Sequence, residues 1–142
     1  MNCMTNKEIE EICRKHNIIN YEINDNGDVD VDGSVNISCA DLSEIPLKFG
    51  EVKGDFVCER NELTSLKGSP MKVGGNFNCD DNELVSLEGS PQNIGGWFSC
   101  DNNKLVSLEA GPHEVGGDYN CSNNELKLLN GFNTKFEGEF YC

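Results

Sequence analysis

One segment contains many of the positions that recur along this chain: Val73-Gly74-Gly75-Asn76-Phe77-Asn78-Cys79-Asp80-Asp81-Asn82-Glu83-Leu84. Its pattern returns 21 residues later, from Ile94 to Leu105, and once more from Val115 to Leu126. A fixed interval in this range is typical of a solenoid, in which each repeat forms one coil. The repeated positions include cysteines (Cys58, Cys79, Cys100, Cys121 and Cys142), asparagines (Asn61, Asn82, Asn103 and Asn124) and leucines (Leu63, Leu84, Leu105 and Leu126).

The repeats cover most of the 142-residue chain, a length suited to one domain. Five full periods lie between about residue 31 and residue 135, and a sixth begins and stops at residue 142. We therefore expect two parts. Residues 1–30 form an N-terminal capping helix and β-hairpin, and residues 31–142 form five 21-residue repeats plus a partial sixth.

Each repeat begins with a predicted strand. The segment from Val52 to Cys58 alternates between inward and outward positions, as in a half-buried strand. Asn61 then turns the chain, Leu63 and Leu66 return to the interior, and Pro70 excludes a long helix. The pattern predicts a parallel β-sheet of five to six short strands, with turns or 3₁₀ segments on the convex side.

These repeats resemble the leucine-rich repeat family. The family pattern L-x-x-L-x-L-x-x-N-x-L corresponds to Phe56-x-Cys58-x-x-Asn61-x-Leu63 and its three later copies. The 21-residue length is similar to the short bacterial subtype, and the Gly-Gly-x-Phe-x-Cys segments are similar to small bacteriophage-encoded members. The resemblance implies a leucine-rich-repeat-like solenoid that binds partners on its strand face. Aromatic and Cys residues replace the usual strand leucines, and Ala40 replaces Asn in the first coil.

The N-terminal segment has its own signals. The sequence from Thr5 to Glu8 matches a capping box, and the apolar residues that follow predict an amphipathic helix over about residues 5–16. Tyr21 to Val31 alternates around a turn at residues 24–28, which predicts a hairpin. We expect both elements to cap the first coil. The Asp-rich residues 25–32 lack the spacing and the final Glu of a calcium-binding EF-hand loop, so no metal is predicted there.

The repeated cysteines and asparagines are interpreted as structural. The cysteines predict a stack of buried thiols, with metal binding or redox chemistry as the alternative. No C-x-x-C pair occurs, and neither His16 nor His113 has ligand spacing. A reducing, cytoplasmic location is the simpler account of unpaired cysteines. The asparagine amides are expected to bind backbone groups at the turn, and Cys3, Cys13 and Cys39 stay unassigned.

Charge and motifs exclude several function classes. Eleven Lys and Arg against 25 Asp and Glu give a net charge of −14, which argues against direct nucleic-acid or anionic-membrane binding. No apolar run approaches the length of a membrane span, and Met1 to Glu8 lacks the apolar segment of a signal peptide. No catalytic constellation or phosphate loop is found, so the chain is expected to be no enzyme and to need no cofactor.

The outward positions of the predicted strands carry the unrepeated residues. They form a polar and acidic strip around Trp97, the only tryptophan, which is a hot-spot candidate for partner binding. As alternatives, Trp97 shields a neighbouring coil and the charge serves only solubility. The predicted partner-binding residues are Trp97, Asp55, Val57, Glu59, Asn76, Asn78, Asp80, Ser99, Asp101, Asp118, Asn120, Glu139 and Tyr141.

Three functions fit these residues. The first is a non-enzymatic protein–protein interaction module with a basic partner, and by resemblance to phage proteins alone an inhibitor of a host bacterial defence protein. The second is an acidic nucleic-acid mimic that blocks a nuclease or DNA-binding protein. The third is a self-assembling protein, because the last repeat ends inside a strand at residues 139–142 whose open edge can pair with a second copy.

Overall fold

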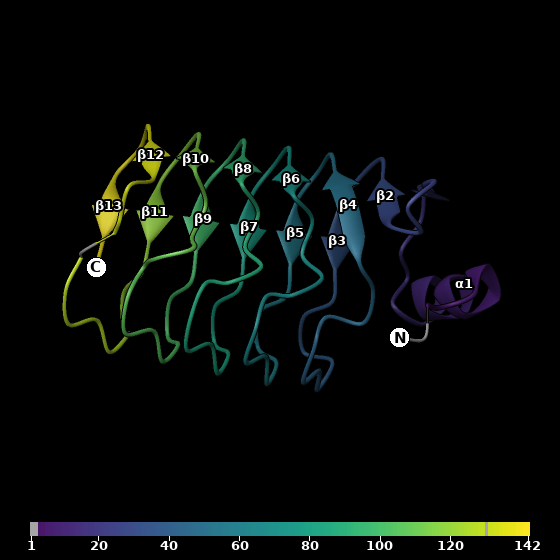
Figure 1. The fold of residues 1–142 in the computed structure, drawn as a ribbon, viewed down its shortest axis with the longest axis horizontal. Helices are drawn as coiled ribbons and strands as arrows, with labels where there is room; N and C mark the ends of the chain where they lie inside the picture. The colour runs from purple at the N-terminus through teal and green to yellow at the C-terminus, as the bar shows by residue number, and fades with distance from the viewer. Residues whose placement is uncertain (1–2, 130) are drawn as a thin grey trace.

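Two rows of short parallel strands run along the long axis of the molecule (Figure 1). The computed structural model describes residues 3–129 and 131–142, which wind into a β-solenoid of about five turns. One sheet has seven strands in the order β1 (Tyr21–Ile23), β2 (Val29–Val31), β4 (Phe49–Val52), β6 (Lys72–Val73), β8 (Asn93–Ile94), β10 (Glu114–Val115) and β12 (Lys135–Phe136). The other has six strands in the order β3 (Val35–Asn36), β5 (Phe56–Val57), β7 (Phe77–Asn78), β9 (Phe98–Ser99), β11 (Tyr119–Asn120) and β13 (Phe140–Tyr141).

The register of the six-stranded sheet reproduces the 21-residue interval of the sequence. Phe56 pairs with Phe77, Phe77 with Phe98, and each pairing is parallel. The same step continues to Tyr119 and Phe140 on the last two strands. Each repeat is therefore one coil, and equivalent residues of successive coils lie directly beside one another, as the sequence predicted.

One prediction about the strands is wrong. The segment from Val52 to Cys58 is not a single strand, because the chain turns a corner at residues 53–55 and passes from β4 to β5. Glycines permit this corner, since adjacent coils approach closely there. A Cβ atom on Gly74 would lie 2.2 Å from the Lys53 carbonyl oxygen, and one on Gly95 would lie 2.3 Å from that of Gly74. The corner creates a second parallel sheet that the alternation pattern did not predict.

The convex part of each coil consists of turns and bends. Residues 3–129 and 131–142 contain no 3₁₀ helix, so the turn prediction is confirmed and its 3₁₀ alternative is not. Leu63 and Leu66 return to the interior from this part of the coil, and both are fully buried.

Aromatic rings form a continuous stack inside the solenoid. The rings of Phe56 and Phe77 lie 5.5 Å apart between centroids, and those of Phe77 and Phe98 lie 5.8 Å apart. All three are fully buried, as is Tyr119 in the next coil. Beside them, Cys58, Cys79, Cys100 and Cys121 form the predicted row of buried thiols, and all eight cysteines of the chain are free. For Cys142 the prediction is wrong: it is exposed, because it lies in the last coil, which no further coil covers.

The asparagines form the predicted hydrogen-bonded row at the turn. Asn82 accepts from the Leu63 amide at 3.0 Å, and its side-chain nitrogen donates to the carbonyl oxygens of Cys58 (3.0 Å), Cys79 (3.1 Å) and Asp80 (3.1 Å). The other members of the row repeat this arrangement. One amide therefore ties two coils together and satisfies backbone groups that the turn leaves unpaired.

The N-terminal end is covered by the predicted helix and hairpin (Figure 1). The helix α1 (Asn6–Lys15) has Thr5 as its N-cap, with both hydrogen bonds of the capping box to Glu8. It buries Ile9 and Cys13, while β1 and β2 form an antiparallel hairpin whose second strand continues into the parallel sheet. Among the described residues, no helix has the length and apolar character needed to cross a membrane.

Candidate binding surface

The six-stranded sheet presents the predicted site residues on one face. We call this the outer face, since it points away from the Phe and Cys side chains of the core. Its first row precedes the aromatic position, its second row lies between the aromatic residue and the Cys, and its third row follows the Cys. The first row is Ser34, Asp55, Asn76, Trp97, Asp118 and Glu139; the second is Asn36, Val57, Asn78, Ser99, Asn120 and Tyr141; the third is Glu59, Asp80, Asp101 and Ser122.

The first row is a chain of side-chain-to-backbone hydrogen bonds between coils. The Asp55 carboxylate accepts from the Asn76 amide at 2.7 Å. The Asn76 side chain in turn accepts from the Trp97 amide at 2.9 Å. Further along, Asp118 accepts from the Glu139 amide at 2.8 Å. These side chains therefore have a structural role on a face that the sequence assigned to partner binding, because each satisfies an amide at the corner of the next coil.

The second and third rows are also linked. Asn78 accepts from the Asp80 amide at 2.9 Å and donates to the Glu59 carboxylate at 3.0 Å. Asp80 accepts from the Ser99 hydroxyl at 2.6 Å and from the Asp101 amide at 2.8 Å. Burial raises the pKa of Asp80 above its ordinary value, and these two hydrogen bonds partly oppose that rise. The polar groups of the strip are thus held in fixed positions.

Ser99 departs from its prediction as an accessible contact residue. Its residue surface is only 6% exposed, although it lies on the outward side of its strand. The hydrogen bond to Asp80 ties its hydroxyl to the preceding coil. Ser99 therefore supports the face from within and offers little area to a partner.

Trp97 breaks the first row. The indole has an N–H donor and no acceptor, so it cannot bind the amide of Asp118 as Asn76 binds the amide of Trp97. In the described chain, the Asp118 amide has no hydrogen-bond acceptor. Trp97 is 38% exposed, which places a large aromatic surface partly in solvent.

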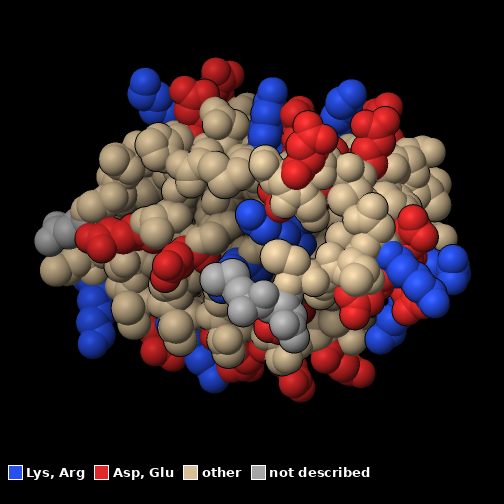
Figure 2. All heavy atoms as spheres, turned by 45° about the vertical axis from the view of Figure 1, so that its right-hand side comes forward, with Lys and Arg blue, Asp and Glu red and all other residues tan. Residues whose placement is uncertain are grey.

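The charges of the outer face all have one sign. Its three rows contain six carboxylates and no Lys or Arg. On the side of the molecule that holds the N-terminal end, acidic and basic side chains are instead intermixed (Figure 2). The ion pairs found within the described ranges lie outside the three rows: Lys48–Asp28 (3.3 Å), Arg60–Asp81 (3.7 Å), Lys72–Glu51 (3.7 Å) and Lys104–Glu83. Among the described residues, the six carboxylates of this face therefore have no ion-pair partner.

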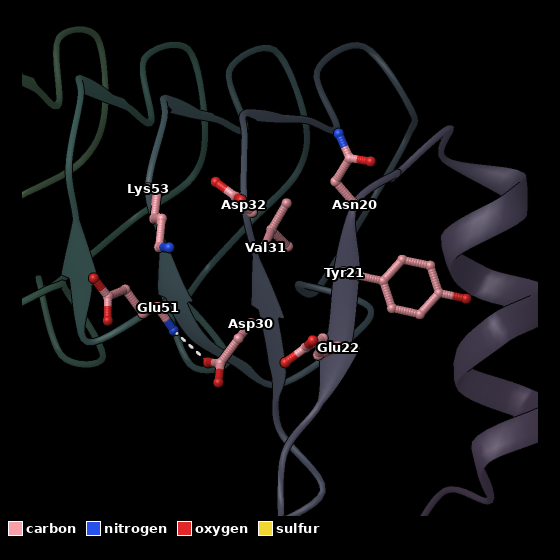
Figure 3. Close-up of a pocket in the computed structure, with 8 residues that line it drawn as sticks. All are labelled: Asn20, Tyr21, Glu22, Asp30, Val31, Asp32, Glu51 and Lys53. Carbon is pink, nitrogen blue, oxygen red and sulfur yellow. Dashed lines mark hydrogen bonds between the residues drawn. The ribbon is translucent and has the colours of Figure 1, made fainter.

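A shallow groove of about 490 Å³ lies beside the hairpin (Figure 3). Glu22, Asp30, Asp32 and Glu51 line it together with Lys53. Asp30 is already engaged, since it accepts from the Glu51 amide at 2.8 Å, as the dashed line in Figure 3 marks. In residues 3–129 and 131–142, no group of three or more His, Cys, Asp and Glu side chains is arranged to hold a metal ion.

A second groove of about 550 Å³ crosses the outside of the seven-stranded sheet. Its floor includes the corner glycines Gly74, Gly95 and Gly116, and charged side chains such as Lys72 and Glu114 line it. Close packing of neighbouring coils explains these glycines, because each Cβ would strike the preceding backbone.

At the C-terminal end, β12 and β13 are edge strands of their sheets. Tyr141 is 45% exposed, and its hydroxyl donates to the Glu139 carboxylate at 2.5 Å. Both residues therefore occupy the outer face as predicted. Self-association through this edge stays a prediction.

A comparison with protein-family models, with curated proteins and with solved structures found no match to this chain. The architecture is that of a β-solenoid repeat protein.

Proposed function

We propose that this chain is a non-enzymatic protein-binding module that holds a basic protein partner on its outer face. The observation that carries the proposal is Trp97, a partly exposed aromatic residue at a position where other coils place hydrogen-bond acceptors. Large aromatic side chains dominate binding energy at protein interfaces. The six surrounding carboxylates favour a partner of opposite charge and speed its encounter.

The finer parts of the proposal come from the repeat pattern. The F-x-C-x-x-N-x-L coils support kinship with leucine-rich repeat proteins of the short bacterial and bacteriophage type. A phage-encoded inhibitor of a host bacterial defence protein would act in the host cytoplasm, where free thiols such as the buried cysteine row persist. That assignment rests on analogy between repeats.

Affinity capture from a bacterial lysate tests this proposal. The baits are the wild-type chain, Trp97→Ala, and Val106→Ala as a matched control, since Val106 is an exposed apolar residue at 47% that lies outside the three rows. We expect a basic protein that the wild type and the control retain and that Trp97→Ala loses. Equal recovery of every captured protein by all three baits would contradict the role of the outer face.

One observation supports nucleic-acid mimicry as a second candidate. Glu59, Asp80 and Asp101 place carboxylates on three successive coils of the third row, which gives a regular line of negative charge. A mimic should compete with DNA for its partner, and its binding should weaken steeply with salt. Trp97 has no part in such mimicry. A complex that forms equally well in the presence of DNA would contradict the mimic, and one that also forms equally well with Trp97→Ala would contradict both candidates.

A further inference from the structure

The amide of Asp118 is an open donor in a row where the corresponding amides are satisfied. Equivalent amides on Asn76 and Glu139 bind a side-chain oxygen of the preceding coil. The preceding residue of Asp118 in that row is Trp97, whose side chain has no oxygen to accept from the amide. Both Trp97 and Asp118 are exposed residues in adjacent coils, so the interruption of the row lies at the surface.

Charge decides which acceptor suits this donor. A free N–H can bind an anion or a neutral carbonyl, and the anion is disfavoured by the carboxylates of Asp118 and Glu139 in the same row. Successive coils lie about 4.8 Å apart. The Asp118 carboxylate is one coil away from Trp97, and the Glu139 carboxylate is two coils away. A neutral carbonyl from a peptide backbone meets the donor without that repulsion.

The indole adds a second preference. A guanidinium or ammonium group over an indole face gains cation–π attraction, and carboxylates near the ring strengthen the preference for a cation. Asp118 is fixed in place by the hydrogen bond from Glu139, so its charge stays beside the ring without further ordering. The Asp118 amide, the Trp97 indole and the Asp118 carboxylate together match a peptide that carries a carbonyl and a cationic side chain close to each other.

We propose that Trp97 and Asp118 form a recognition site for an extended, arginine- or lysine-bearing segment of a protein partner. The segment's main-chain carbonyl accepts from the Asp118 amide, and its cationic side chain lies on the Trp97 indole beside the Asp118 carboxylate. This site rests on the proposed function and deepens it, because it names the part of the partner that the outer face recognises.

Nuclear magnetic resonance titration of the ¹⁵N-labelled chain tests the site with a defined probe. The probe is the acetylated and amidated peptide Gly-Arg-Gly-Arg-Gly, and the matched control replaces both arginines by glutamine. We expect the Asp118 amide and the Trp97 indole N–H resonances to shift together with the arginine peptide only. An unchanged Asp118 resonance, or equal shifts with both peptides, would overturn the proposal.

The variant Trp97→Asn supplies the missing acceptor, as Asn76 does for its own neighbour. We expect its Asp118 amide to exchange more slowly with solvent and its affinity for the arginine peptide to fall about tenfold, which corresponds to loss of one cation–π contact and one donor. Trp97→Ala removes the indole and leaves the donor open, so its affinity should lie between those of Trp97→Asn and the wild type. The dispersion of the amide spectrum verifies that each variant is folded.

The outcomes separate this site from the broader proposal. Peptide-induced shifts at Asp55 and Asp80 without shifts at Trp97 and Asp118 would remove the recognition site and leave an acidic binding face. Wild-type affinity in Trp97→Asn would also overturn the site. Failure of the lysate experiment, by contrast, would count against the proposed function whatever the peptide does.

Discussion

The two faces of the six-stranded sheet are built from the same strands and repeat for different reasons. On the inner face, Phe56, Phe77 and Phe98 recur because each ring packs on the ring of the next coil. On the outer face, Asp55 and Asn76 differ in residue type but share an oxygen that binds the next coil's amide. Ring stacking on the inner face requires one side-chain shape, so the same residue type recurs there. The backbone amide on the outer face requires only an oxygen acceptor, so the residue type can vary.

This difference shows how to recognise a residue that the fold does not require. A change from Asp to Asn in the first row keeps the hydrogen bond and carries little information about function. The Trp97 side chain accepts from no amide of the next coil and exposes an aromatic ring, so among the described residues the fold gains no side-chain hydrogen bond from it. On the inner face, the matching departure is Tyr119, which brings a hydroxyl into an apolar stack.

The largest expected effect is on the inner face. Phe77→Ala removes a fully buried ring that stacks on two neighbours, and it should lower the free energy of unfolding by about 3–5 kcal/mol. Asn78→Ala, one residue away on the outer face, is the control and should cost about 1 kcal/mol or less. Urea denaturation followed by circular dichroism measures both values. Equal losses would show that the two faces contribute equally to stability, which would contradict the difference argued above.

The asparagine row should be almost as sensitive. Asn82→Ala removes one acceptor and a donor group that serves three carbonyl oxygens, and the hydrogen bonds that it breaks are buried except for the part-buried one to Asp80. We expect a loss of about 3 kcal/mol, since each buried polar group without a partner costs about 1–3 kcal/mol. Asn82→Asp keeps the acceptor and loses the donors, so its free energy of unfolding should also fall. A loss below about 1 kcal/mol for Asn82→Ala would contradict this role.

The sequence alone was sufficient to predict the 21-residue coil, the N-terminal helix and hairpin, and the residues of the core. A 21-residue interval in Cys, Asn and Leu positions fixes which residues meet across coils, and the signals at Thr5 and Glu8 fix the helix start. The corner that divides each predicted strand was not predictable from alternation. Val52 and Phe56 are four residues apart and both point inward, as they would in one continuous strand. The corner depends on contact between coils, which a pattern within one coil does not contain.

The candidate site was predicted in position and only partly in role. Alternation placed Asp55, Asn76 and Asp118 outward correctly, but it gave no sign that their oxygens bind the backbone. One signal was present in the sequence, because these row members are all short residues with an acceptor. Trp97 is the member without one, and that contrast points to the same residue as its exposure does.

Tyr119→Phe should stabilise the protein. The Tyr119 hydroxyl is buried without a hydrogen-bond partner, and burial raises the pKa of this phenol well above its ordinary value. Removal of the unsatisfied group should raise the free energy of unfolding by about 1 kcal/mol. Gly111 stands where the preceding coil has Ser90, and a Cβ there would lie 3.3 Å from the hydroxyl, so the glycine leaves room for it. Thermal denaturation of both proteins measures the change, and a lower melting temperature for Tyr119→Phe would show that the hydroxyl has a partner.

The smallest effect belongs to a single hydrogen bond of the first row. Asp55→Ala removes the acceptor of the Asn76 amide and should cost about 1 kcal/mol, whereas Asp55→Asn keeps an acceptor oxygen and should change the free energy of unfolding by a few tenths of a kcal/mol. Hydrogen exchange of the Asn76 amide gives the same comparison at one site, with faster exchange in Asp55→Ala than in Asp55→Asn. If both variants behave alike, the carboxylate serves charge and not the backbone. Trp97 would then no longer be an exception in this row. Its lack of a side-chain acceptor matters only if the acceptors of the other row members bind the amides of the next coil.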